Sequence, residues 1–174
     1  AMKKQSPELI IQFHKETLAD LIEIYQKRGL TNVDIINSFN AKGKLEDSLW
    51  KIPEAYGKNN QRYISESVKL IRDELDRLKI KRNKSSIWTN TDLKKGLSLN
   101  NKLPFDSIES YKVELEHVVE KQVLVPLLIN TKSRNEVFKI IDQYNLGCLV
   151  LESEHNKLPD KKFDAKDPWI RYKE

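Results

Sequence analysis

The stretch Leu146-Gly-Cys-Leu-Val-Leu151 decides the fold, because it is the best strand candidate in the sequence. Its apolar run is continuous rather than alternating, which is typical of a strand buried on both faces. The preceding segment Ser133–Tyr144 has the apolar spacing of a helix, and the polar segment 152–162 follows. A buried strand beside an amphipathic helix favours an α+β fold.

A second short strand is predicted over Tyr111–Glu116, where apolar and polar residues alternate. Val118–Ile129 is predicted to begin as a helix and to break near Pro126. The end of the chain, DAKDPWIRYKE, is predicted to form a short helix anchored by Trp169. Residues 96–174 are therefore expected to form a small unit of two short strands flanked by helices.

The first part of the chain, residues 1–95, is predicted to be a helical region. Ser6-Pro7-Glu8 has the residues typical of a helix start, and Gly29 is placed to end that helix. Thr31 with Asp34 predicts the start of a second, shorter helix.

Two further helices are predicted in this region. One covers residues 45–55 and is interrupted by Pro53, and the clearest helix of the chain covers 61–80 with its apolar residues on one face. The whole sequence contains only 5 glycines and 6 prolines, which argues against a turn-rich all-β fold. The expected class is thus a predominantly helical α+β protein.

Charge is unevenly distributed between the two parts. Residues 1–95 carry 19 lysines and arginines against 13 acids, whereas residues 96–174 carry 12 against 13. A basic part suits contact with a polyanion, and we expect nucleic acid as the partner. The residues expected to contact phosphates are Lys79, Lys81, Arg82 and Lys84. Alternatively, these cations stabilise the C-terminal end of their helix through its dipole.

The sequence predicts a cytoplasmic protein without a membrane partner. It contains no run of about 18 apolar residues and no signal peptide. Its single cysteine, Cys148, can form no internal disulfide, which fits a reducing compartment. Cys148 lies in an apolar run and is predicted to be a buried small hydrophobe rather than a catalytic thiol. The oligomeric state is left open.

Two of the three histidines lie where chemistry can be expected. His117 and His155 each follow a predicted strand, and each is directly preceded by a glutamate, whereas His14 is an ordinary helix residue. If the strands pair, the two imidazoles can converge. An imidazole can activate water, and together with carboxylates it can hold a divalent cation.

The segment Glu116-His117-Val-Val-Glu120 resembles the opening motif of the HNH, or ββα-metal, nucleases. Asn145–Leu151 followed by His155-Asn156 is similar to the second strand and closing His or Asn of that family. The resemblance implies an endonuclease that hydrolyses phosphodiesters, with DNA as the expected substrate. It further implies that His117 is the general base, that Glu116 with His155 or Asn156 binds Mg²⁺ or a similar ion, and that Asn145 is structural.

Two other interpretations stay open. His117 and His155 can be isolated polar residues at strand ends, with no shared chemistry. The chain can also be a non-catalytic helical module that binds nucleic acid or a protein partner, with its C-terminal part as scaffold.

Overall fold

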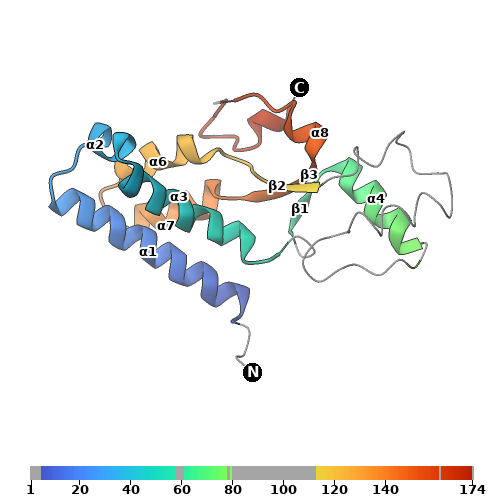
Figure 1. Ribbon diagram of the computed structural model, residues 1–174, viewed down its shortest axis with the longest axis horizontal. Coiled ribbons are helices and arrows are strands. Elements are labelled where there is room, and N and C mark those ends of the chain that lie inside the picture. The colour runs from blue at the N-terminus through green and yellow to red at the C-terminus, as the bar shows by residue number, and fades with distance from the viewer. Residues whose placement is uncertain (1–4, 58–60, 78, 80–112, 161, 174) are drawn as a thin grey trace. The chain divides into compact units, whose positions relative to one another are not determined.

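The computed structural model describes residues 5–57, 61–77, 79, 113–160 and 162–173. Its elements in chain order (Figure 1) are α1 (Pro7–Lys27), α2 (Asn32–Asn37), α3 (Phe39–Glu54), β1 (Tyr63–Ile64), α4 (Glu66–Arg77), β2 (Val113–His117), α6 (Lys121–Ile129), α7 (Arg134–Tyr144), β3 (Gly147–Leu151), α8 (Glu152–His155) and the 3₁₀ helix η3 (Ile170–Tyr172). The predicted class, a predominantly helical α+β fold, is confirmed.

The chain forms two compact units that interleave along the sequence. Unit 1 comprises residues 1–55, 117–146 and 159–174, and unit 2 comprises 56–116 and 147–158. The boundary predicted at residue 95 lies outside the described residues. Each unit draws on segments from both sides of that position, so neither unit corresponds to one contiguous half of the chain.

The helix starts follow from local hydrogen bonding. The Ser6 hydroxyl accepts the amide N–H of Leu9 and Pro7 is the first residue of α1, while Gly29 adopts a φ of 67° directly after the C-cap. Thr31 and Asp34 form a reciprocal capping box at α2. The hydrogen bonds from Thr31 lower the pKa of the Asp34 carboxyl. The predicted helix starts at Ser6 and Thr31 are confirmed.

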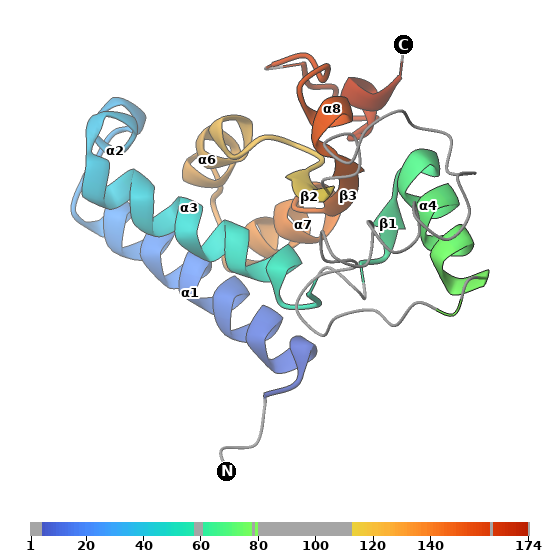
Figure 2. The same cartoon turned by 45° about the vertical axis from the view of Figure 1, so that its right-hand side comes forward.

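The core of unit 1 lies among its helices. Helix α1 packs against α3 and α7, and α3 also contacts α6, an arrangement visible in Figures 1 and 2. The largest completely buried side chains of this core are leucines and one isoleucine, namely Leu18, Ile35, Leu45, Leu49, Leu124 and Leu128. Leu45 and Leu49 in α3, and Leu124 and Leu128 in α6, are four residues apart, so each of these two helices buries one apolar stripe.

Two prolines were predicted to interrupt helices, and both predictions are wrong. Pro53 lies inside α3 and Pro126 lies inside α6. A proline lacks the N–H that would bond to the carbonyl four residues earlier. For Pro53 that carbonyl belongs to Leu49, and it accepts the side-chain amide of Asn145 at 2.9 Å instead. The hydrogen bond lost to Pro53 is thereby replaced from another part of unit 1.

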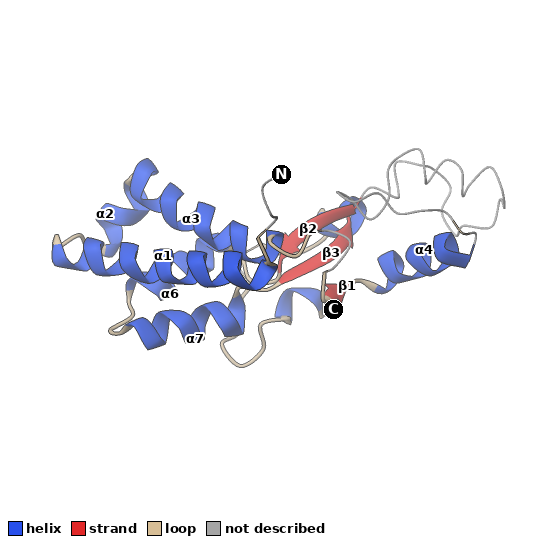
Figure 3. Cartoon of the chain, turned by 90° about the horizontal axis from the view of Figure 1, so that it is seen from below, coloured by secondary structure: helices blue, strands red, loops and turns tan. Residues whose placement is uncertain are grey.

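A three-stranded sheet with the order β1-β3-β2 gathers residues distant in sequence. Strand β1 pairs in parallel with β3, with Tyr63 opposite Cys148. The amide of Val118, just after β2, donates to the carbonyl of Leu146, just before β3, at 2.9 Å. The end of β2 therefore lies at the start of β3, and these two strands, drawn side by side in Figure 3, run antiparallel.

Several boundaries differ from the prediction. The helix expected from Gln61 begins at Glu66, because Tyr63 and Ile64 form β1. The polar segment after β3 contains the short helix α8. Near residue 170 the chain forms η3, and the ring of Trp169, just before η3, contacts that of Tyr172. Within the described residues, no helix is long and apolar enough to cross a membrane.

Candidate acid-base and metal site

Strand β2 separates its residues into two environments. Glu114 and Glu116 are half-buried, whereas Leu115 and His117 are buried. Successive side chains of a strand point to opposite faces, so the two glutamates share one face and His117 lies on the other. The predicted pair Glu116 and His117 is therefore divided between the faces of its own strand.

The face with the glutamates meets His155 within unit 2. The Oε2 atom of Glu116 contacts Nδ1 of His155, although 39 residues separate them in the sequence. On the other side of the same ring, Nε2 lies 3.9 Å from Oε2 of Glu114. The His155 side chain is 40% exposed and that of Glu116 is 11% exposed. The three side chains form a site that solvent can reach through His155 and Glu114.

Helix α8 places His155 in this site. It starts immediately after β3, and Glu154 fixes its first turn by accepting the amide N–H of Leu151 at 3.0 Å. The same Oε1 atom of Glu154 accepts the hydroxyl of Ser65 at 2.7 Å. Because Ser65 follows β1 and donates its own amide to Leu149 in β3, the helix is tied to the sheet.

This arrangement has a defined chemical capacity. A carboxylate that accepts the Nδ1–H of an imidazole fixes the tautomer whose Nε2 carries a lone pair. The Glu116 carboxylate is placed to accept the Nδ1–H of His155. The lone pair of Nε2 is then on the side of the ring where Glu114 lies. Glu114 was not predicted from the sequence, although the two-residue period of the strand places it on the face of Glu116.

The donor set is small for a metal ion. Among the described residues, no group of three or more His, Cys, Asp or Glu side chains is arranged to hold one. His155 Nε2 and a Glu114 oxygen supply two donors of different kinds. An imidazole with a carboxylate suits Mn²⁺ or Zn²⁺ better than Mg²⁺, which prefers oxygen and keeps several waters. Asn156, the third predicted ligand, is the exposed C-cap residue of α8.

His117 belongs to unit 1 and has a different environment. His117 is 6% exposed, and its ring centre lies 4.9 Å from that of Trp50. Burial, reinforced by the positive charges of Lys121 and Arg171, lowers the pKa of His117 to about 4, against an opposing contribution from the Asn145 amide. Neither ring nitrogen has a hydrogen-bond partner among the described residues.

The predicted structural residue Asn145 and the unpredicted Arg171 surround His117. Asn145 is 4% exposed, and its side-chain amide donates a hydrogen bond to the Leu49 carbonyl. Arg171, equally buried, donates from Nη1 to the backbone carbonyl of His117 at 3.0 Å and from Nε to that of Pro159 at 2.9 Å. Nothing in the sequence around Arg171 distinguishes it from a surface cation.

The predicted phosphate-contacting residues are mostly outside the described part of the chain. This applies to Lys81, Arg82 and Lys84, whereas Lys79 is described, is exposed and has a φ of 58°. Cys148 is buried, as predicted, and desolvation together with the nearby charges of Glu154 and Glu116 raises the pKa of its thiol to about 12.

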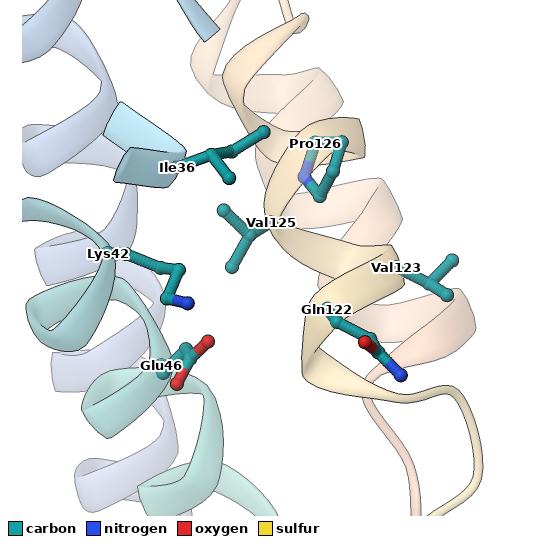
Figure 4. A pocket seen from close by; sticks show the side chains of 7 residues that line it. All are labelled: Ile36, Lys42, Glu46, Gln122, Val123, Val125 and Pro126. Carbon is teal, nitrogen blue, oxygen red and sulfur yellow. The ribbon is translucent and has the colours of Figure 1, made fainter. Parts of the chain in front are cut away.

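Unit 1 also contains a pocket of about 430 Å³ between α2, α3 and α6. Figure 4 shows that Ile36, Val125 and Pro126 form its apolar part and that Lys42 and Glu46 line it from α3. None of the residues that line this pocket is among those predicted for the nuclease site.

No family model matches this chain, and neither a curated protein nor a solved structure matches it.

Proposed function

We propose that this chain is a divalent-metal-dependent endonuclease that hydrolyses nucleic-acid phosphodiesters. The observation that supports this function is the contact between Glu116 and His155. The resemblance to HNH nucleases assigned metal binding to both residues, which are 39 positions apart in the sequence. A solvent-accessible imidazole between two carboxylates is an arrangement that hydrolytic sites use.

In this proposal, the three side chains have separate roles. Glu116, largely buried, accepts the Nδ1–H of His155 and holds the ring in position. His155 Nε2 and Glu114 are the donors that would hold the ion, with water and phosphate oxygens completing its coordination. When bound, a divalent ion would neutralise charge on the phosphate.

His117 has no chemical role in this proposal, unlike the general-base role that the resemblance implies. A base must reach water or substrate, and His117 is buried, with only 6% of the residue exposed. Its low pKa of about 4 also makes it a weak proton acceptor. DNA remains the proposed substrate, supported by the net charge of +5 and the excess of lysine and arginine before residue 95.

The test combines cleavage with metal binding. Supercoiled plasmid is incubated with the full chain and Mn²⁺, Mg²⁺ or Zn²⁺, with EDTA as the metal-free control. We expect nicking that His155→Ala abolishes and that Glu116→Gln reduces about 10- to 100-fold, the range observed when a partner of a metal-binding histidine is lost. Mn²⁺ affinity, measured by calorimetry, should fall in parallel for Glu114→Gln.

The matched control is Ser153→Ala, an exposed substitution in the same short helix as His155. It should retain nicking and Mn²⁺ binding. The proposal fails if the wild-type chain nicks plasmid with none of the metals, or if His155→Ala cuts as fast as wild type.

A non-catalytic interaction module is the second candidate, and a specific observation favours it. Large apolar side chains stay exposed on the helices of unit 1, with Phe13 at 63% and Phe39 at 89%. Exposed aromatic residues that gather on one surface commonly mark a protein interface. Absence of cleavage in the plasmid assay would leave this function as the better supported one.

A further inference from the structure

A groove between α1 and α3 lies in unit 1. It has a volume of about 560 Å³, and its lining includes Phe13, Thr17 and Leu21 from α1 and Phe39 and Gly43 from α3. Both phenylalanines are more than half exposed. The groove therefore presents two aromatic side chains to solvent beside an open space, called the hollow below, and it lies within a single unit of the protein.

Gly43 makes the hollow. It is an interior residue of the 16-residue helix α3, where a glycine is less favourable than an alanine by about 1 kcal/mol. A Cβ atom placed on Gly43 would meet nothing within 4 Å. Packing inside the described chain thus gives no reason for a glycine at this position. A glycine on an open helix face allows the backbone of another molecule to approach closely.

Phe39 forms the corresponding projection. The Ser38 hydroxyl accepts the amide N–H of Ala41 at 3.3 Å and caps α3, so Phe39 is held as the first residue of the helix. Phe39 is nevertheless 89% exposed. An aromatic side chain that is fixed at a helix start and exposed to water contributes little to the stability of a monomer. Such a residue is typical of an interface anchor.

The charges beside the groove are of both signs. Lys44 and Asp47 both line it and both are exposed. Neither forms an ion pair with another described residue. The face thus combines a projection, a hollow, a cation and an anion.

We propose that a second copy of this chain occupies this groove in a two-fold symmetric dimer. A two-fold interface requires one face to be complementary to itself. If one residue of the first copy contacts a different residue of the second, the symmetry repeats the same contact with the two copies exchanged. Here Phe39 of one copy enters the hollow beside Gly43 of the other, and Lys44 pairs with Asp47 across the interface. The dimer involves unit 1 alone and does not depend on the proposed nuclease activity.

The dimer is tested by sedimentation equilibrium of the full chain over a concentration series. Phe39→Ala should raise the dimer dissociation constant about 30-fold, as loss of an aromatic anchor does. Val33→Ala is the matched control, because Val33 is 66% exposed on α2 and does not line the groove. Gly43→Gln should also weaken the dimer while the thermal midpoint of the monomer stays equal or rises.

A charge exchange identifies the occupant as a second copy. Lys44→Asp and Asp47→Lys should each raise the dissociation constant about fivefold, as expected for exposed ion pairs. The double variant K44D/D47K should restore wild-type affinity, since both copies carry both changes. A monomer at every concentration would overturn the proposal. A dimer that Phe39→Ala leaves intact, or that the double variant fails to restore, would overturn it as well.

Discussion

The two histidines that follow predicted strands, His117 and His155, have opposite environments. His155 is 40% exposed and lies between the carboxylates of Glu114 and Glu116. His117 is 6% exposed and lies against Trp50, near positive charges. Both are preceded by a glutamate in the sequence. The comparison teaches that the sign of the surrounding charge and the access of water, rather than the local sequence, decide what an imidazole can do.

The environment of His117 is unfavourable to its protonated form in two ways. Burial removes the water that would solvate an imidazolium. In addition, Arg171 donates to the His117 carbonyl, and the Nζ atom of Lys121 lies 5.8 Å from the Trp50 ring centre. The protein therefore keeps His117 neutral, and this has a measurable consequence for its stability.

The largest effect that distinguishes the two histidines should be a pH dependence due to His117. Its pKa is about 4 in the folded chain and near the ordinary 6.5 when unfolded. Between these values the unfolded chain binds more protons, so the free energy of unfolding falls as pH drops from 6.5 to 4. The full contribution is about 3 kcal/mol. Urea denaturation at a series of pH values measures it.

Two variants isolate this contribution from that of the acidic residues. His117→Leu should lose this component of the pH dependence while remaining folded, because a buried apolar side chain needs no hydrogen-bond partner. His155→Ala should retain it. An unchanged pH profile in His117→Leu would contradict the assignment.

The elements that the sequence predicted well depend on local chemistry. The caps at Ser6 and Thr31 need only residues within one turn, and the apolar run of β3 identifies itself by composition. The two-residue strand β1 has no such signal. It exists because Tyr63 pairs with Cys148, which lies 85 positions later, and long-range pairing cannot be recognised in a short polar segment.

The site was predictable only in the parts that local sequence determines. Both strands beside the contact of Glu116 with His155 were predicted, but their antiparallel pairing places the end of β2 at the start of β3. The helix α8, which was not predicted, brings His155 back to Glu116. The burial of His117 was not predictable, because it depends on Trp50 in α3 and Arg171 near the chain end. Both residues approach His117 only through the packing of unit 1.

A second prediction tests the buried side of the comparison through Asn145. Asn145→Ala should lower the free energy of unfolding by about 2 kcal/mol, because the buried Leu49 carbonyl loses the donor that replaces the N–H absent from Pro53. In a Pro53→Ala background the backbone N–H returns, so the same substitution should cost less. Denaturant unfolding of the four chains measures this coupling, and equal costs in both backgrounds would show that Asn145 acts otherwise.

The smallest effect should come from the exposed side of the comparison. Glu116→Gln removes the negative charge from the contact that the proposed function requires, and His155→Ala removes its imidazole, yet each should change the free energy of unfolding by less than about 1 kcal/mol. The reason is that His155 is 40% exposed, so water solvates the ring when its partner is lost. Denaturant unfolding at neutral pH is the measurement. A loss comparable to that of Asn145→Ala would mean that the pair stabilises unit 2, and the carboxylates around His155 would then be structural, as the Asn145 amide is in unit 1.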